Sequence, residues 1–441
     1  MGKTSPQGYT FPMTNETNQT QTKNLAKQTV LVGMTGKISS SVTAYLLKKQ
    51  GYRVIGVCVL WFDDPAQIQN YPQWHIPDIN EVKKVCDQLD IEFYGVQGKD
   101  VFQAYIEEPY LSARLMGKAF ALNCSFHQAL FRVLQEKSLK VKADFISTGH
   151  FAKITKNQST QKYNLMTAND LKNDQSHLLA RLDQSMLARL DLPLAEVSAV
   201  QVKKLGDALG LVDTAKVKKS LRYETREMAA FDEYFRTRVA NTFLKEGQIV
   251  NWIDQEVLGE HSGIHLYTLG QTSVVGKDNL QLDAHLQIIN IDTNAHAVYV
   301  VKDTEFQIDH LLLDQVRLDP ELNLARPIEL FVKVNGDERK FQGLMMVKNS
   351  FKAMIELKEK LSFFLPPGEQ VCLYQKEGSS SKVLGFGVIQ KAGCFHPLGS
   401  FLPTIPSKPQ KDGPDEDEYE DPQVAKERKQ REDQLKTGIL F

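Results

Sequence analysis

A short polar loop near the start of the chain has the residue types that bind phosphate. Residues 35–41 read Thr-Gly-Lys-Ile-Ser-Ser-Ser and lie between an apolar run and a stretch with helical spacing. In an open parallel sheet, a loop that leads into a helix N-terminus presents backbone N–H groups to an anion. The loop contains neither GxxxxGKS/T nor GxGxxG, so it matches neither the Walker nor the dinucleotide fingerprint. We therefore expect an anion site of another kind.

Thiol chemistry is the second possibility that the residue types suggest. The five cysteines, an odd number, are widely spaced, with no CxxC pair and no histidine cluster at metal-ligand spacing: Cys58, Cys86, Cys124, Cys372 and Cys394. We therefore expect no metal site and a reducing compartment. The N-terminal residues lack the apolar core of a signal peptide, and no run approaches the length of a membrane span. These features predict a cytoplasmic protein without a membrane contact.

Alternating strands and helices must position these groups. Short apolar runs rich in β-branched residues are separated by segments of helical spacing, and the runs occupy residues 29–34, 52–60, 91–96 and 143–150. This alternation predicts an α/β domain over residues 28–211, with a parallel sheet covered on both faces. The formal net charge of −1 gives no global basic field, so a polyanion must be bound by a local patch.

The rest of the chain has a different organisation. Residues 281–395 show period-two alternation with Asn-Gly-Asp and Pro-Gly turns, which predicts a small antiparallel barrel. Residues 212–280 mix helical spacing with Gly-rich loops and are expected to form a small central domain. Residues 1–27 are polar and residues 396–441 carry long charged runs, so we expect a flexible tail at one end and a disordered charged tail at the other.

The loop resembles the S-G-G-x-D-S-S loop of the N-type ATP pyrophosphatases, the PP-loop or adenine nucleotide alpha hydrolase-like proteins. In this comparison Thr35 stands for the first Ser and Gly36 for the first Gly, while Ser40 and Ser41 stand for the closing pair. The resemblance implies a site for the pyrophosphate of ATP, used while a substrate is adenylated.

Two residues of the loop depart from that pattern. Lys37 replaces the second Gly, and Ser39 replaces the Asp that in the family helps to hold magnesium. The Lys37 ammonium either neutralises phosphate charge in place of a metal or fills the pocket and excludes ATP. Because Ser39 leaves the loop without a carboxylate, we expect weak or absent ATP hydrolysis, and nucleotide binding stays open.

Further segments resemble the motifs of one family in order and at compatible spacing. They are ADFISTGHFAK at 143–153, NDQSHLL at 173–179, LPLAEVSAVQVKKLGDALGL at 192–211, LGEHSGIHLYTLGQ at 258–271 and LPPGEQVCLY at 365–374. Together they are similar to the tRNA-specific 2-thiouridylases, the MnmA family. The resemblance implies a PP-loop nucleotide domain, a small central domain that contacts tRNA, and a C-terminal antiparallel β-barrel.

The resemblance also implies a reaction. ATP, with magnesium, adenylates the C2 oxygen of the wobble uridine of tRNA and so turns it into a leaving group. A persulfide sulfur then attacks, and a second cysteine releases the sulfur by disulfide exchange. The implied partners are tRNA and, if the chain is active, a sulfur-relay protein.

Both cysteine positions of the family carry other residues here. Ser125 falls on one position and Glu224 on the other, while Cys124 lies one residue before the first. Cys124 either serves in a shortened loop or is a half-buried structural thiol before a helix that Ser125 caps. No cysteine lies between Cys124 and Cys372, so a sulfur relay in this region lacks its donor.

The resemblance implies two sets of binding residues. The nucleotide set comprises Gly33, Thr35, Gly36, Lys37, Ser39, Ser40, Ser41, Val59 and Gly149. The tRNA set comprises Asp174, Gln175, Ser176, Lys216, Lys218 and Lys219. The lysines belong to a basic excess over residues 203–226, which either contacts phosphates or is a solvated face. His150 either faces the nucleotide or caps the sheet edge, and Trp61 either lines an adenosine pocket or packs at its rim.

Three functions are compatible with these residues, because a fold does not fix a function. The first is a degenerate homologue, a pseudoenzyme that still binds tRNA or a nucleotide. The second is an active tRNA-uridine 2-sulfurtransferase with a rearranged cysteine set. The third is a scaffold or regulatory subunit whose tails bind protein partners. The missing cysteines and the missing loop carboxylate favour the first.

Overall fold

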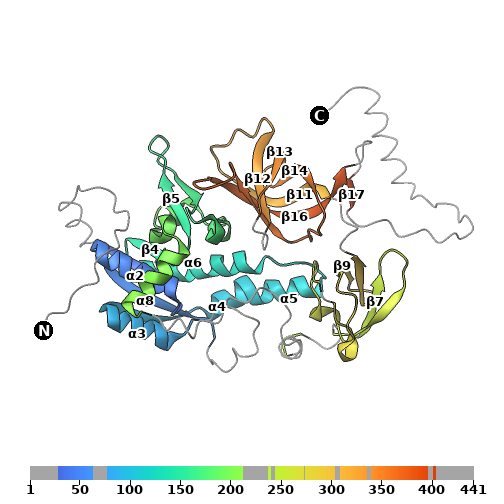
Figure 1. Cartoon of the computed structure of the whole chain (residues 1–441), viewed down its shortest axis with the longest axis horizontal. Helices are drawn as coiled ribbons and strands as arrows, with labels where there is room; N and C mark the ends of the chain where they lie inside the picture. Colours follow the sequence, from blue (N-terminus) through green and yellow to red (C-terminus); the bar gives the residue numbers. More distant parts are fainter. Residues whose placement is uncertain are drawn as a thin grey trace, which may run out of the picture. The chain divides into compact units, whose positions relative to one another are not determined.

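The computed structural model describes residues 28–62, 77–211, 237–239, 244–272, 274–302, 308–334, 339–395 and 401–403. The two expected tails, residues 1–27 and 396–441, lie almost wholly outside these ranges. Three groups of elements follow one another along the described chain (Figure 1).

The N-terminal group contains a four-stranded parallel sheet in the order β3-β2-β1-β4. Its elements are β1 (Thr29–Gly33), α2 (Ile38–Gln50), β2 (Arg53–Leu60), α3 (Ile79–Leu89), β3 (Glu92–Gln97), α4 (Lys99–Phe102), the π-helix η2 (Gln103–Glu107), α5 (Glu108–Leu115), α6 (Leu122–Lys140) and β4 (Phe145–Thr148). The four runs predicted as parallel strands are therefore confirmed.

Short elements follow β4 before the second group. They are β5 (Ala152–Lys156), β6 (Tyr163–Thr167), η3 (Leu171–Asn173), η4 (Ser176–Leu179), α7 (Gln184–Leu187), η5 (Pro193–Glu196) and α8 (Ala199–Leu209). α8 begins with a capping box, in which Ser198 and Gln201 satisfy one another's backbone N–H groups. It ends at Gly210, whose φ of 60° suits a left-handed cap.

Alternate side chains of β1 enter two different cores. Val30 and Val32 pack with residues of α2, α3 and α8, whereas Leu31 packs on the opposite face with residues of α6. A strand whose successive side chains point to opposite faces produces this division, and it confirms a sheet covered on both sides. The rigid sheet fixes where the loop after β1 lies.

The central group is a second sheet in the order β8-β7-β10-β9. Its strands are β7 (Gly247–Asn251), β8 (Val257–His261), β9 (Leu286–Asp292) and β10 (Ala297–Lys302), and the 3₁₀ turns η8 (Ile264–Leu266) and η9 (Lys277–Asn279) lie between β8 and β9. Residues 286–302, expected in the C-terminal barrel, thus belong to this sheet instead: β10 pairs with β7, and β9 pairs with β10. Period-two alternation identifies a strand but carries no information about its partner.

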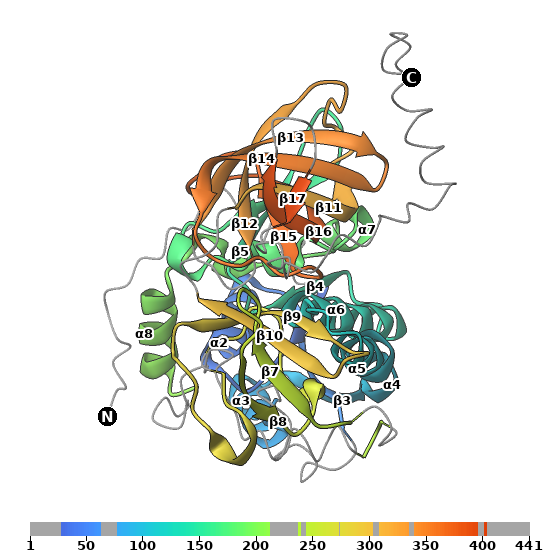
Figure 2. The same cartoon turned by 90° about the vertical axis from the view of Figure 1, so that its right-hand side faces the viewer.

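The C-terminal group is an antiparallel barrel, as predicted. Its strands are β11 (Ile308–Leu318), β12 (Ile328–Val334), β13 (Phe341–Asn349), β14 (Lys352–Leu361), β15 (Gln370–Tyr374), β16 (Val383–Phe395) and β17 (Phe401–Pro403). The order is β11-β14-β13-β12-β15-β16-β17, and pairing between β11 and β16 closes the first six strands into a ring. Figure 2 shows these strands curving around a common core.

Two features of the described residues concern membranes and metals. No helix in the described ranges is both long enough and apolar enough to pass through a membrane. Nor do the described residues bring three His, Cys, Asp or Glu side chains together in a way that would hold a metal ion.

Candidate functional site

The loop between β1 and α2 has the backbone geometry of an anion site. α2 begins at Ile38 after Lys37, whose backbone is extended and whose side chain makes no capping hydrogen bond. The first turn of α2 also contains no acidic residue. The first N–H groups of a helix have no partner within the helix, so this uncapped end can accept a phosphate.

The loop hydroxyls are engaged within the loop itself. Ser40 Oγ accepts a hydrogen bond from the Thr35 N–H at 3.3 Å and donates to the Lys37 carbonyl at 3.0 Å. Ser41 Oγ donates to the same carbonyl at 3.0 Å. Both serine side chains are buried. The hydroxyls therefore hold the shape of the loop, and a bound phosphate would meet backbone N–H groups.

Two glycines let the backbone come close at this site. Gly36 has a φ of 75°, a left-handed conformation that favours glycine. A Cβ atom at Gly149, just after β4, would lie 2.7 Å from the backbone nitrogen of Ser40. The absence of that atom lets the end of β4 pack closely against the start of α2. This cradle fits the phosphate of a nucleotide such as ATP.

The loop fits magnesium less well than it fits a phosphate, because position 39 carries no carboxylate. The nearest acidic residues come from the start of α3, where a Cβ atom at Gly36 would lie 3.0 Å from the Cβ of Glu81. Asp78 Oδ1 accepts hydrogen bonds from the first N–H groups of α3, so this carboxylate caps that helix. The sequence does not reveal these two neighbours, because about forty residues separate them from the loop. The Asp-x-x-Glu pattern predicts only that a helix starts there.

Lys37 lies at the mouth of this loop. Desolvation lowers the pKa of its ammonium from the ordinary value. The cation is therefore placed where it would meet the charge of a bound phosphate or occupy its place, and both interpretations stay open.

The other residues expected near a nucleotide have packing roles. The Val59 side chain is buried in the core between the sheet and α6, so only its backbone can contact a ligand. Trp61 is also buried, and its ring centroid lies 6.0 Å from that of Phe102 and 5.2 Å from that of Phe126. His150 Nδ1 lies 2.7 Å from Thr148 Oγ1, which supports a histidine that caps the sheet edge.

Cys124 lies inside a helix and not before one. α6 begins at Leu122, and the backbone N–H of Ser125 donates to the Ala121 carbonyl at 3.1 Å. The expectation that Ser125 caps this helix is therefore wrong: the apolar packing of α6 starts the helix three residues earlier, without a side-chain cap. The Cys124 side chain is 1% exposed, so the expected half-buried thiol is fully buried.

None of the four described cysteines is poised as a nucleophile. Cys58, Cys86, Cys124 and Cys372 are free and buried. Burial raises the pKa of each thiol to about 12, and the nearby Arg181 opposes this only in part at Cys124. Glu224, the three lysines Lys216, Lys218 and Lys219, and the side chain of Cys394 lie outside the described residues.

The segment expected to contact tRNA is tied into the fold. Asp174 Oδ1 accepts hydrogen bonds from the backbone of Ala168 and Ser176, and Oδ2 accepts one from Ser176 Oγ at 2.8 Å. Burial raises the pKa of Asp174. Ser176 Oγ also lies 2.9 Å from the Tyr374 hydroxyl of β15. Gln175 is bonded to the backbone of Phe151 through both its amide oxygen and its N–H.

The parallel sheet and the uncapped helix after β1 define an α/β domain of the PP-loop class. The tRNA methyl transferase HUP domain matches residues 28–222, and the tRNA methyl transferase PRC-barrel domain matches residues 239–302. Together the two matches span more than half of the chain. The chain belongs to the tRNA-specific 2-thiouridylase MnmA family, as a divergent member.

Individual relatives are distant but match over nearly their whole length. The tRNA-specific 2-thiouridylase MnmA of Natranaerobius thermophilus is 26% identical over 371 residues, which cover 82% of this chain and 97% of the relative. That of Picosynechococcus is 29% identical over 370 residues, which cover 82% and 98%. Among solved structures, the NMN synthetase from Francisella tularensis covers 44% of this chain and 69% of its own at 14% identity, and its TM-score of 0.27 adds nothing to the assignment.

Proposed function

We propose that this chain is a degenerate member of its family, one that binds tRNA and a nucleotide without transferring sulfur. The observation that carries the proposal is the position of Cys124, buried in the first turn of α6 with a pKa raised to about 12. The thiolate is the nucleophile in sulfur chemistry, and such a thiol is ionised to only about one part in 10⁵ at neutral pH.

The residues at the two family positions support the same conclusion. Ser125 and Glu224 contain no sulfur, so neither can carry a persulfide or form a disulfide. Cys372 of β15 is buried as well, and burial raises its pKa to about 12. The buried, unpaired cysteines also agree with the reducing cytoplasm, the compartment in which we place the protein.

For the nucleotide, we propose ATP bound at the start of α2. The uncapped helix end, and the close approach of the Gly149 backbone to Ser39 and Ser40, support phosphate binding by backbone N–H groups. Magnesium usually binds through one or two carboxylates plus the phosphates. With Ser39 in the loop, this chain lacks the carboxylate nearest to that metal, which supports weak dependence on magnesium and little hydrolysis.

For the polyanion, we propose tRNA, which the printed names of the relatives specify for those proteins. The expected basic contacts Lys216, Lys218 and Lys219 remain predictions. Lys203, at the start of the same basic stretch, pairs with Asp207 at 2.7 Å, so that part of the stretch is neutralised. The phosphate contacts should therefore lie elsewhere in the stretch or on another element.

The test is to incubate unmodified tRNA with the protein, ATP, magnesium and a persulfide donor, then analyse the digested nucleosides by mass spectrometry. We expect no 2-thiouridine, while a filter-binding assay on the same sample detects tRNA binding. A relative from Clostridium beijerinckii named tRNA-specific 2-thiouridylase MnmA serves as the positive control. Thiolation by this chain that disappears in Cys124→Ala would overturn the proposal and identify an enzyme with a rearranged cysteine set.

A further inference from the structure

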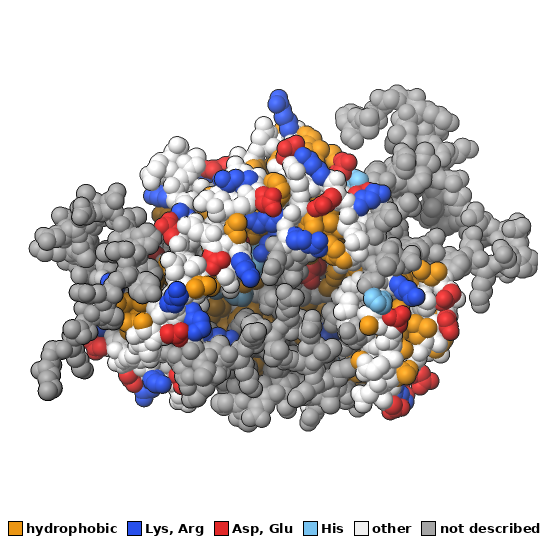
Figure 3. All heavy atoms as spheres, in the orientation of Figure 1, with side chains coloured by type: hydrophobic (Ala, Val, Ile, Leu, Met, Phe, Trp, Pro, Cys, Tyr) orange, Lys and Arg blue, Asp and Glu red, His pale blue; other side chains and the backbone are white. Residues whose placement is uncertain are grey.

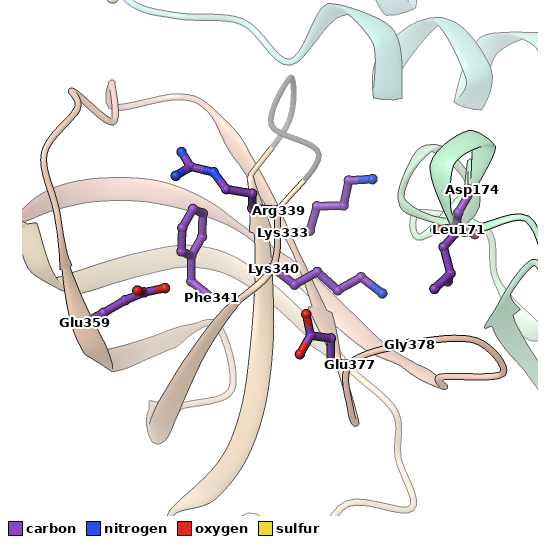
Figure 4. A pocket seen from close by; sticks show the side chains of 9 residues that line it. All are labelled: Leu171, Asp174, Lys333, Arg339, Lys340, Phe341, Glu359, Glu377 and Gly378. Atoms are coloured by element: carbon purple, nitrogen blue, oxygen red, sulfur yellow. The ribbon is translucent and has the colours of Figure 1, made fainter.

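A cavity of about 320 Å³ lies where strands β12 and β13 meet the segment that precedes η4. Its wall includes Asp174 from that segment, Lys333 from β12, and Arg339 and Lys340 from the residues just before β13 (Figure 4). The cavity is separate from the loop after β1. Two of these charged residues, Lys333 and Lys340, form no ion pair within the described part of the chain.

The two lysines of the cavity extend toward the Asp174 carboxylate without forming an ion pair with it. Lys333 is 9% exposed, and the buried Lys340 Nζ makes no hydrogen bond; among the described residues, neither lysine forms an ion pair. Lys340 Nζ instead lies 3.8 Å from the centroid of the Tyr374 ring. Desolvation lowers the pKa of Lys340; the Asp174 carboxylate opposes this shift, and the neighbouring Lys333 lowers the pKa further. An ammonium removed from water without a full set of acceptors is costly, so this arrangement favours an added anion.

Among the described residues, the carboxylates of the cavity form no ion pair with either lysine. The oxygens of Asp174 already accept three hydrogen bonds from Ala168 and Ser176. Figure 4 shows both lysine side chains extending toward Asp174, whereas Glu359 lies on the far side beside Phe341. Glu377 lies nearest to Lys340, yet no ion pair between the two is formed in the described part of the chain.

We infer that Lys333 and Lys340 together bind one phosphodiester of the tRNA backbone in this cavity. A lysine has a compact charge on a flexible side chain. It is suited to contact a phosphate, which fixes the position of the nucleic acid but carries no information about its sequence. The Lys340 stem lets its ammonium leave the Tyr374 ring and reach the anion. The inference rests on the proposed binding of tRNA, and it assigns part of that binding to the barrel.

An RNA phosphate fits better than a free nucleotide. The two ammonium groups lie on the Asp174 side of the cavity, while its aromatic ring, Phe341, lies on the other side (Figure 4). A base on that ring and a phosphate on the two lysines would therefore have to lie on opposite sides of the cavity. Figure 3 shows charges of both signs interspersed over the visible face, so no broad basic surface there substitutes for this local pair.

The test measures tRNA affinity as a function of salt for Lys333→Gln, Lys340→Gln and the double variant. Each lost phosphate contact lowers the salt slope by about 0.7 to 0.9, and because the two lysines share one phosphate, the double variant should lose about that much and bind roughly 10-fold more weakly. Lys358→Gln is the matched control, since Lys358 lies on β14 of the same barrel with its side chain 53% exposed. Lys333→Arg with Lys340→Arg should keep most of the slope.

The outcomes separate this inference from the proposed function. If the wild type and the double variant bind tRNA with equal affinity and slope, the inference is overturned and tRNA binding stands. If the wild type binds no tRNA, both fall. Calorimetry with ATP and with inorganic phosphate should give equal affinities for the wild type and the double variant; a loss of ATP or phosphate affinity with tRNA binding intact would overturn the RNA assignment. An unfolding midpoint checks each variant, and Lys340→Gln alone carries the test if changing Lys333 unfolds the barrel.

Discussion

The hydroxyl of Ser176 lies 2.9 Å from the hydroxyl of Tyr374, and both side chains are buried. The same serine donates to Asp174 Oδ2 at 2.8 Å, so Asp174, Ser176 and Tyr374 form one continuous chain of hydrogen bonds. A tyrosine of the barrel is thereby connected to the segment that follows the parallel sheet. This chain of hydrogen bonds fixes the wall of the cavity that contains Lys333 and Lys340.

Replacing Tyr374 with Phe should lower the free energy of unfolding. The change removes a hydrogen bond between buried groups and leaves Ser176 with one partner fewer, which costs about 1 to 3 kcal/mol. Urea denaturation measures the loss. Tyr105→Phe is the control because Tyr105 is partly exposed, and it should change stability by less than about 0.5 kcal/mol. Equal stabilities of the two variants would contradict the buried hydrogen bond.

Gly149→Ala should impair both folding and phosphate binding. Its Cβ atom would lie 2.7 Å from the Ser40 nitrogen and 2.8 Å from the Ser39 carbonyl carbon, and backbone atoms cannot move aside cheaply. We expect a loss of about 1 to 3 kcal/mol in stability, together with weaker ATP binding by calorimetry.

Gly95→Ala is the matched control for that substitution. The nearest atoms to its Cβ, at 3.5 and 3.6 Å, are in ordinary contact range. This variant should retain the ATP affinity of the wild type. If Gly149→Ala behaves in the same way, the start of α2 is not where the phosphates bind.

Ser39→Asp should make ATP binding dependent on magnesium. A carboxylate in the first turn of α2 stabilises the free protein by about 0.3 to 1 kcal/mol through the helix dipole, and it repels phosphates when no metal is present. With magnesium the same carboxylate becomes a ligand. Calorimetry should therefore show weaker ATP binding without magnesium and stronger binding with it. Ser39→Asn, which is uncharged and of similar size, should show neither change.

Cys124 should react with iodoacetamide only when the protein unfolds. Because burial raises the pKa of its thiol to about 12 and its side chain is 1% exposed, native alkylation at pH 7.5 should be at least roughly 100-fold slower than alkylation in guanidinium. Peptide mapping measures the alkylation of Cys124 separately from that of the other cysteines. Rapid labelling of Cys124 in the native protein would contradict the proposed loss of sulfur chemistry.

The sequence predicts the N-terminal parallel-sheet domain and the C-terminal barrel well. It predicts poorly which residues and strands contact one another. Residues 52–60 are apolar on both sides of the chain, as a strand covered on both faces must be, and β2 occupies nearly the same range. Residues 286–302 are also recognisable as strands. Their place in the sheet of β7 and β8 depends on contacts that no local pattern contains.

The site shows the same limit. The loop at Gly36 can be recognised in the sequence because its backbone shape depends on residues that are adjacent in the chain. The Lys333 and Lys340 pair was missed, since its meaning depends on Asp174, more than 150 positions earlier in the chain. The Ser125 cap was predicted wrongly because packing of the apolar face of α6 outweighs the preference for a serine at a helix start.

His177 should make stability depend on pH in the acid range. Burial and the nearby cations Lys333, His127 and Lys340 lower the pKa of His177 to about 3, and its Nδ1 atom is buried without a hydrogen-bond partner. The folded state therefore keeps the ring neutral, while the unfolded chain takes up a proton below its ordinary pKa of about 6.5. The stabilisation is complete above that pH and is lost as the pH falls toward 3.

This dependence can be measured by urea denaturation between pH 7 and pH 4. Between the two pKa values, the unfolded state binds one proton more than the folded state at this position, so His177 contributes a slope of up to about 1.4 kcal/mol per pH unit. His177→Phe should flatten the profile by that amount, whereas His285→Gln, at an exposed position, should leave it unchanged. Parallel profiles for the wild type and His177→Phe would mean that position 177 takes up its proton equally in both states. That result would contradict the burial of this ring beside the two lysines of the cavity.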